Sequence, residues 1–557
     1  GDVYKRQGYA GNYGKTFTGR IKQGGGMLFT SYAFIAFIAV AFFLYYRIPR
    51  KWQWPFLLII SIGFYASAGI FYPIFLLVSS AVTYLAGLWI ERDRKQEKTY
   101  IRENAGQFAS RQEKKEFKQK GEKRRRNLMV SALLILLAVL GVFKYADFVI
   151  DNMNAVFYAV GSDRELEYLD LLLPMGISFY TFQSLGYLLD VYWEKIDAQK
   201  NFFKHLLFVS FFPQLVQGPI SRYSDLSQTL YEEHVFDKKQ VIFGLERILW
   251  GYFKKLVVAD TILTATTAVI GDEYYNGAWV LVGIIFYGIE LYADFTGGID
   301  ITIGIAQVFG VKVAENFIRP YFSKNIAEYW RRWHISMGTW FRDYIFYPMS
   351  ISKRMGKLTK FCKTHFGKGV AKRVPVYLAT MVTWFATGIW HGASWNFVMW
   401  GIMNGVIILI SQELEPLYAR FHKQFPSLGQ RKGYQAFQIV RTFFLMGSLR
   451  MFDCYGDVPL SFSMFFSMFR DFDLRALTVD EFLDLGLNIP QYVIVFAGTV
   501  LMFSASVIGR KESVREQLSR KPYVVRYAAV AALFLTVVLF GSYGVGYDAA
   551  QFIYNQF

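Results

Sequence analysis

One histidine in this chain stands where titratable side chains are rare. His391 lies in the stretch GIWHGASW (388–395), and no other side chain in residues 374–412 titrates near neutral pH. A neutral imidazole takes a proton from an attacking hydroxyl near physiological pH, typically worth about 10²–10⁴-fold in rate. Ionisable groups in membrane-like segments are costly and usually mark a pathway or a reaction. A structural histidine bonded to a backbone carbonyl is the other interpretation, although the neighbouring Gly392 would leave room for a substrate.

The segment around His391 is too long for one straight membrane helix. As a helix, residues 374–412 would span about 58 Å, nearly twice a hydrocarbon core of about 30 Å. The chain must therefore fold back or break, most plausibly at 392–394, with Gly401 and Gly405 as rival positions. Basic residues flank both ends, so both ends are expected on the same side of the membrane. This predicts that His391 lies at the inner tip of a helical hairpin and faces an enclosed cavity.

The composition indicates a membrane protein with several crossings. Of 557 residues, 54% are hydrophobic and 19% are charged, whereas about 25% of residues are charged in a typical soluble protein. Several uncharged runs reach or approach the roughly 20 residues that cross a bilayer as a helix. The clearest runs are 28–46, 70–90, 128–143, 374–412, 490–509 and 527–541. The predicted fold is all-α and polytopic.

The net charge of +18 is concentrated in loops. Loop 91–126 carries 14 Lys/Arg against 7 Asp/Glu, and loop 350–373 carries 8 Lys/Arg and no acid. An excess of basic residues in short loops is typical of the cytoplasmic side. These loops are therefore expected to meet the cytosol and membrane lipid headgroups, and nucleic acid is not an expected partner.

The basic loops also predict the topology. Residues 55–90 should form a helical hairpin that turns near 67–69 and returns to the cytoplasmic loop. Residues 509–521 are basic as well, so the two flanking spans should meet on the cytoplasmic side. The start of the first span and the C-terminus are then expected outside.

Proline and glycine interrupt the middle of the chain. Residues 171–190 contain Pro174, Gly176 and Gly186, and residues 210–223 contain two prolines. Broken helices at membrane depth are tolerated only where they are buried in protein or line a wet cavity. We therefore expect broken or re-entrant helices around a central tunnel. No internal repeat is visible, which weighs against an inverted-repeat transporter.

Residues 325–349 predict an amphipathic helix of another kind. Asn325 and Glu328 have the spacing of an N-cap and its partner. One helical face then carries Trp330, Trp333, His334, Met337 and Phe341. Because Arg331 and Arg332 would be costly in hydrocarbon, this helix is expected in the interface or inside the protein, with its arginines on lipid phosphate or an anionic ligand.

Three stretches carry a family resemblance. They are ENFIRPYFSKNIAEYWRRWHISMGTWFRDYIFYPM (315–349), TGIWHGASWNFVMWG (387–401), and LPMGISFYTFQSLGYLLDVY (173–192) with FFPQLVQGPISR (211–222). They resemble the WRRWHIS and WHGASW blocks and the upstream core of the membrane-bound O-acyltransferase (MBOAT) family, in the branch of bacterial alginate O-acetylation. The resemblance covers roughly residues 170–405.

The resemblance implies transfer of an acyl group from a thioester to a hydroxyl. His391 corresponds to the near-invariant catalytic histidine of the family, and His334 to the second histidine of this branch. The imidazole would act as a general base, polarise the thioester carbonyl or carry the acyl group itself, and these roles stay open. Where the branch often has a third histidine, this chain has Asn404, so that histidine cannot be essential in an active enzyme.

Further residues are candidates for substrate or donor binding. Trp390 and Trp395 are expected to shape the cavity, and Asn396 to orient the substrate or the His391 ring. Arg331 and Arg332 are candidates for the phosphates of a coenzyme A donor, with lipid headgroups as the alternative.

Polar groups in apolar runs are a second set of candidates. Gln183 and Asp294 either line the tunnel or satisfy the backbone of broken helices, and Trp330 joins the donor-site candidates. The two cysteines, Cys362 and Cys454, show no metal-ligand spacing, and no metal site is expected.

Four parts follow along the chain. Residues 1–26 are polar and glycine-rich and are expected to be extraneous or disordered. Residues 27–170 hold N-terminal transmembrane helices, 171–412 the MBOAT catalytic core, and 413–557 C-terminal transmembrane helices.

The leading interpretation is an acetyltransferase of the bacterial inner membrane. It would pass acetyl groups from cytoplasmic acetyl-CoA to an extracytoplasmic polysaccharide, directly or through an SGNH-type or lipoprotein partner, and it would hold no bound cofactor. One alternative is D-alanyl transfer from a carrier protein to teichoic acid. A remoter alternative is a proton-coupled transporter, which the missing repeats and a paucity of membrane-embedded acids disfavour.

Overall fold

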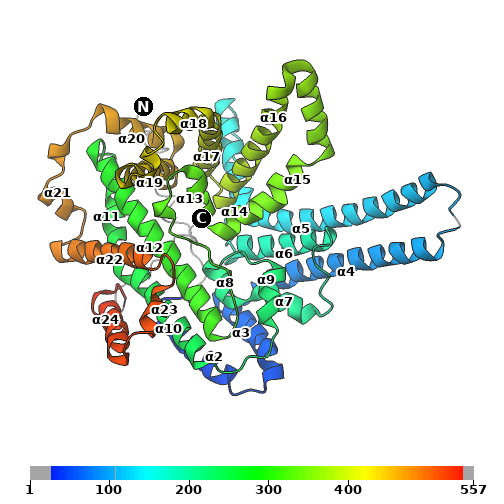
Figure 1. The fold of residues 1–557 in the computed structure, drawn as a ribbon, viewed down its shortest axis with the longest axis horizontal. Helices are drawn as coiled ribbons and strands as arrows, with labels where there is room; N and C mark the ends of the chain where they lie inside the picture. The colour runs from blue at the N-terminus through cyan, green and yellow to red at the C-terminus, as the bar shows by residue number, and fades with distance from the viewer. Residues whose placement is uncertain (1–26, 107, 544–557) are drawn as a thin grey trace. The chain divides into compact units, whose positions relative to one another are not determined.

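The computed structural model describes residues 27–106 and 108–543, and all regular structure in these ranges is helical (Figure 1). Six helices of the described chain are long and apolar enough to cross a membrane. They are α4 (Pro73–Glu103), α5 (Arg111–Ala159), α12 (Ala278–Val308), α17 (Trp395–Glu413), α22 (Ile489–Ile508) and α24 (Tyr523–Phe540). The predicted all-α, polytopic fold is confirmed. The prediction for residues 1–26 lies outside the described ranges.

The described residues form two compact units. The N-terminal unit comprises residues 27–241 and 306–314, and the C-terminal unit comprises residues 242–305 and 315–543.

The N-terminal unit begins with the predicted helical hairpin. Helix α3 (Gln53–Ala68) ends one residue before Gly69, and α4 begins at Pro73, so the turn near 67–69 is confirmed. The first span was predicted too long, because α2 (Tyr32–Tyr45) has only 14 residues. The other helices of this unit are α6 (Ile177–Tyr192), α7 (Phe202–Ser210), α8 (Phe212–Gln217) and α9 (Tyr223–Leu230).

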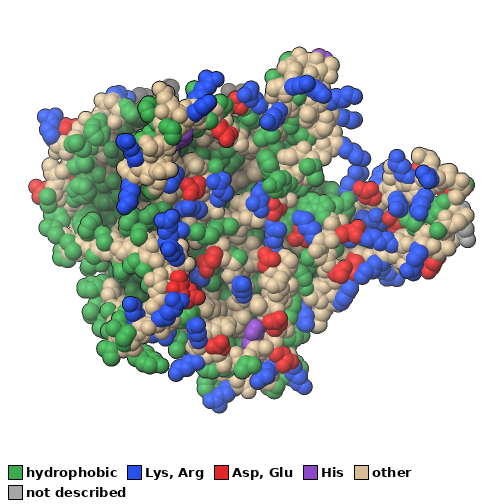
Figure 2. All heavy atoms as spheres, viewed as in Figure 1, with side chains coloured by type: hydrophobic (Ala, Val, Ile, Leu, Met, Phe, Trp, Pro, Cys, Tyr) green, Lys and Arg blue, Asp and Glu red, His purple; other side chains and the backbone are tan. Residues whose placement is uncertain are grey.

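The predicted loop 91–126 is mostly helical, because residues 91–103 end α4 and residues 111–126 begin α5, and the two helices pair there as a charged hairpin (Figures 1 and 2). The Arg125 guanidinium donates to Asp93 at 3.0 Å and to Glu97 at 2.9 Å. Asp93 and Glu97 of α4 are therefore paired with Arg125 of α5. Lysines and arginines dominate the surface of the hairpin (Figure 2).

Two of the predicted interruptions are confirmed and one is wrong. Helix α6 starts after Gly176, whose φ of 69° is left-handed and where a Cβ would overlap the carbonyl oxygen of Leu215. Residues 218–222 separate α8 from α9. Gly186, however, lies inside the continuous α6, so this glycine does not break the helix.

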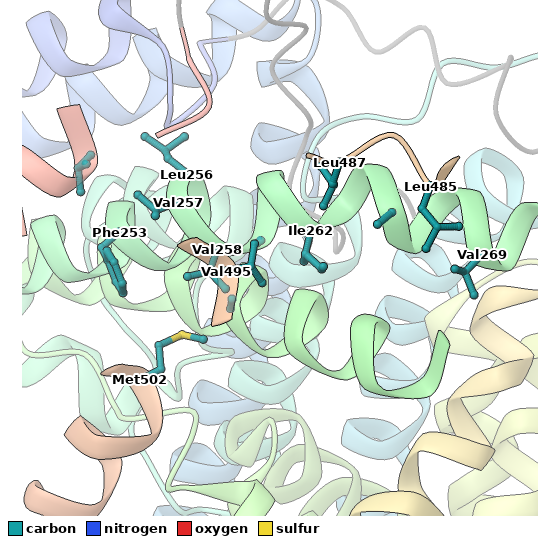
Figure 3. Close-up of a cluster of buried hydrophobic side chains, with 14 of the residues drawn as sticks. Phe253, Leu256, Val257, Val258, Ile262, Val269, Leu485, Leu487, Val495 and Met502 are labelled. Atoms are coloured by element: carbon teal, nitrogen blue, oxygen red, sulfur yellow. The ribbon is translucent and has the colours of Figure 1, made fainter. Parts of the chain in front are cut away.

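In the C-terminal unit, α10 (Lys238–Tyr252), a π-helical segment (Phe253–Ala259) and α11 (Asp260–Gly271) pack against α12. Glycines set the spacing of α10 and α12, since a Cβ on Gly251 would lie 2.6 Å from the Gly297 oxygen. Figure 3 shows the apolar core around the π-helical segment, which α22 completes through Val495 and Met502.

The same unit holds residues 315–401, which contain two of the motif stretches, and the C-terminal helices. These are α13 (Ile326–Arg332), α14 (Ile335–Phe341), α15 (Tyr347–Ser350), α16 (Lys353–His391), α18 (Glu415–Gln424), α19 (Lys432–Cys454), α20 (Val458–Arg470), α21 (Val479–Asp484) and α23 (Val514–Ser519), with short 3₁₀ or π segments at Pro320–Phe322, Arg342–Phe346, Leu428–Gln430 and Leu474–Ala476. The predicted spans 490–509 and 527–541 correspond to α22 and α24.

Candidate active site

The predicted break beside His391 is confirmed. Helix α16 ends at His391, residues 392–394 are non-helical, and α17 begins at Trp395. The two helices pack backbone to backbone, because a Cβ on Gly388 would lie 3.1 Å from the Gly401 Cα and would overlap the Phe397 carbonyl oxygen. Gly401 is therefore a helix contact and not the rival break.

The His391 imidazole is buried among aromatic rings. His391 is only 6% exposed. Its ring centroid lies 4.4 Å from that of Trp400 and 5.0 Å from that of Trp390. Phe397 stacks at 6.3 Å. These rings hold the imidazole in place without placing a charge on it.

The expectation that Gly392 leaves space for a substrate is wrong. A Cβ at this position would overlap the Phe397 ring, so that ring already fills the space. Glycine is needed here for packing, and any approach to His391 comes from another side.

Gly392→Ala is accordingly expected to displace Phe397 and lower both the thermal unfolding midpoint and catalysis. The control is Gly356→Ala in the preceding helix α16, where nothing lies within 4 Å of an added Cβ and alanine should stabilise slightly. Thermal unfolding of both purified variants checks this. Equal unfolding midpoints for the two variants would contradict the packing role of Gly392.

Residues 325–349 do not form one continuous helix. Asn325 caps α13 as predicted, accepting from the Glu328 amide at 2.8 Å. The helix then stops before Trp333, and His334 takes a left-handed φ of 45°. The predicted single stripe from Trp330 to Phe341 is therefore wrong, since α14 starts in a new direction after His334.

A buried asparagine fixes the turn at His334. The Asn316 side chain lies 3.2 Å from His334 Nδ1, and its Oδ1 accepts from the amide and the hydroxyl of Ser336. The Ile335 amide also donates to the Asn316 carbonyl. Burial, with a smaller effect from Arg450, lowers the pKa of His334 to about 3, so this imidazole is neutral at physiological pH.

Trp390 joins the two histidines. Its ring centroid lies 5.0 Å from that of His391 and 6.0 Å from that of His334. Two imidazoles from distant stretches thus share one indole, which is an arrangement suited to proton transfer and carbonyl polarisation at a single buried centre.

Arg450 is a buried cation that the sequence reading missed. Its guanidinium lies 5.1 Å from the Trp400 ring and 5.4 Å from the Trp333 ring, and Nη1 donates to Asp453 at 2.7 Å. Arg450 therefore braces the ring that contacts His391. The sequence could have indicated Arg450, because Arg450 and Asp453 are charged residues in an apolar run, as His391 is a titratable residue in one.

The aromatic and amide candidates around the break have separate roles. Trp330 Nε1 donates to Asn404 Oδ1 at 3.2 Å, so Asn404 fills a structural position. Asn396 Nδ2 donates to the Tyr455 carbonyl at 2.6 Å, which anchors the start of α17. Trp395 is 59% exposed and, unlike Trp390, does not belong to the buried cluster.

The two arginine candidates differ in exposure. Arg331 is exposed, whereas Arg332 is partly buried, pairs with Glu328 at 2.6 Å and donates to the Arg319 carbonyl. Gln183 belongs to the N-terminal unit, where it donates to Gln214 at 3.3 Å.

Asp294 does not support a broken helix. It lies within the continuous α12, and Lys255 Nζ pairs with it at 2.5 Å and with Asp260 at 2.8 Å. Asp300, also in α12, pairs with Lys254 at 2.6 Å and with Arg247 at 2.8 Å.

Glu290 adds a third acid to this membrane-length helix. The expectation that membrane-embedded acids are scarce is therefore wrong. Among the residues that the structure describes, no cluster of His, Cys, Asp or Glu could hold a metal ion.

Comparisons with known proteins match one family model and several named relatives. Residues 194–452 match the model of the membrane-bound O-acyltransferase family. A probable alginate O-acetylase (AlgI) of Azotobacter vinelandii is 36% identical over 285 residues, which cover 51% of this chain and 53% of that protein.

More distant relatives carry two other acceptor names. A peptidoglycan O-acetyltransferase of Helicobacter pylori is 29% identical over 331 residues, covering 54% of this chain and 58% of that protein. A teichoic acid D-alanyltransferase of Bacillus subtilis is 25% identical over 295 residues, covering 52% and 68%. The chain spans about half the length of the first of these curated relatives.

Proposed function

We propose that this multi-pass membrane protein, whose residues 194–452 match the membrane-bound O-acyltransferase family model, moves an acetyl group from a cytoplasmic thioester, acetyl-CoA, to hydroxyls of an extracytoplasmic polysaccharide. The observation that carries this proposal is the pair of buried histidines whose rings both lie within 6.0 Å of the Trp390 ring. The protein would act in the bacterial inner membrane, directly or through an extracytoplasmic SGNH-type or lipoprotein partner.

The chemistry assigned to the site is general-base catalysis. His391 takes the hydroxyl proton while the hydroxyl oxygen attacks the thioester carbonyl. The new carbon–oxygen bond forms, the carbon–sulfur bond breaks, and the proton leaves with the thiol. A neutral His334 suits hydrogen bonding to the carbonyl oxygen as negative charge develops there.

We propose acetyl transfer and not D-alanyl transfer because the relatives named for acetylation have the higher sequence identities. Two of the matched relatives are named O-acetyltransferases or acetylases, at 36% and 29% identity, and the D-alanyl relative is 25% identical. Acetyl transfer also needs no carrier protein to dock.

The test is donor consumption by purified protein in liposomes. Labelled acetyl-CoA and a labelled D-alanyl carrier protein are supplied separately, each with and without a polysaccharide acceptor. We expect free thiol and labelled acceptor to form when acetyl-CoA is the donor and the polysaccharide is present, and neither product to form when the D-alanyl carrier protein is the donor. Labelling of the acceptor only when the D-alanyl carrier protein is the donor would replace the proposal by D-alanyl transfer. Proton flux without any thioester consumption would replace it by transport.

A further inference from the structure

Two short segments connect the buried His334 to the protein surface. The Ile318 amide donates to the Arg332 carbonyl at 2.9 Å, and the Ile335 amide donates to the Asn316 carbonyl at 3.0 Å. At one end of this pair Asn316 holds His334. At the other end lie Arg319, three residues after Asn316, and Arg332, two residues before His334.

A third arginine comes from the loop that follows α22. The rings of Phe322 and Phe503 lie 4.9 Å apart and fasten α22 beside the Arg319 turn. Partial burial, then the charges of Arg332 and Arg510, lower the pKa of Arg319. The Arg332 and Arg510 guanidinium groups therefore both act electrostatically on Arg319.

This cluster carries little compensating negative charge. Glu328 pairs with Arg332, but among the described residues no carboxylate lies within ion-pair distance of Arg319 or Arg510. Like charges at close range repel one another. The guanidinium forks match phosphate oxygens in geometry, and an anion bound among them would remove the repulsion.

An open cavity of about 630 Å³ adjoins Arg510. Its walls include Lys511, Arg520 and Lys521, and the lining acid Glu512 is paired with Arg520. This volume falls within the range of about 300–1,000 Å³ that is common for small-molecule sites. The sequence places this loop, 509–521, on the cytoplasmic side, where the donor is found.

We propose that Arg319, Arg332, Arg510 and the adjoining cavity bind the phosphate groups of the thioester donor, whose acyl end then extends along the paired segments to His334. This inference rests on the proposed acetyl transfer from a nucleotide thioester. It gives the loop after α22, which lies outside the matched family region, a part in donor recognition. A lipid phosphate has the same chemistry and is separated from the donor by the experiment.

The experiment compares two acetyl donors that differ in their phosphates. Initial rates are measured in a phosphate-free maltoside detergent with acetyl-CoA and with acetyl-pantetheine, which lacks the nucleotide. For Arg319→Gln/Arg510→Gln we expect KM for acetyl-CoA to rise about tenfold or more with kcat nearly unchanged, as for the loss of charged hydrogen bonds. The acetyl-pantetheine rate should not change. The control is Arg470→Gln/Arg475→Gln, which removes two exposed guanidiniums paired with Asp471 and Asp473.

Other outcomes overturn the proposal. If the double variant changes KM equally for acetyl-CoA and acetyl-pantetheine, or changes neither, the proposed phosphate site is refuted. Competition of phosphatidylglycerol with coenzyme A in a direct calorimetric titration, together with loss of lipid binding in the variant, would assign the site to lipid. Calorimetry also separates the two proposals: arginine-dependent binding of coenzyme A without turnover of any thioester keeps the site but ends the proposed acetyl transfer.

Discussion

Replacing His391 with alanine is expected to lower acetyl transfer by about 10²–10⁴-fold, the usual contribution of a general base. The imidazole is 6% exposed and held between Trp390 and Trp400, so water does not readily replace it as proton acceptor. The measurement is initial transfer from labelled acetyl-CoA at matched amounts of folded protein.

The control for this variant is His365→Ala, which removes an exposed histidine from the same helix α16. Its transfer rate should match that of the unaltered protein. His334→Ala forms a further arm, and we expect a large loss there too because His334 shares Trp390 with His391. Transfer at the unaltered rate by a folded His391→Ala protein would show that His391 is structural.

Arg450→Met is expected to destabilise the C-terminal unit by about 3–5 kcal/mol, because it leaves the Asp453 carboxylate buried without its cation. The side chains of Arg450 and Asp453 are only 9% and 2% exposed. Chemical denaturation of the detergent-solubilised protein measures the free energy of unfolding. Transfer should fall as well, since Arg450 lies against the Trp400 ring that contacts His391.

The double variant Arg450→Met/Asp453→Leu distinguishes a buried charge from a lost packing contact. Replacing both partners with apolar groups should restore most of the lost stability, while transfer stays low if the guanidinium positions Trp400. As a control, Arg475→Met breaks a pair whose arginine side chain is 91% exposed and should leave stability unchanged. A single Arg450→Met variant as stable as this control would refute the role of the buried pair.

Local rules predicted the elements that depend on local sequence. The hairpin at 392–394 followed from helix length against membrane thickness, and the cap at Asn325 followed from a spacing of three residues. The family resemblance pointed to His391 and His334, and the structure adds that Trp390 brings them together.

Contacts between distant residues were out of reach of the sequence. The left-handed turn at His334 depends on Asn316, 18 residues upstream, so no periodicity in 325–349 could indicate it. Similarly, hydropathy did not place α12 among the clearest spans, since its acids lower the average. Their partners Lys254 and Lys255 lie on another segment and become neighbours only on folding.

The paired charges of α12 have a consequence for how the protein enters the membrane during synthesis. Each acid would cost about 2.5–3.5 kcal/mol at the centre of an isolated inserting helix, and α12 carries Glu290, Asp294 and Asp300. Arg247, Lys254 and Lys255, whose charges neutralise Asp294 and Asp300, leave the ribosome earlier, on α10 and the π-helical segment. The cations that pair with Asp294 and Asp300 are therefore already synthesised when α12 emerges, and pairing with them lowers the cost of moving this helix into lipid.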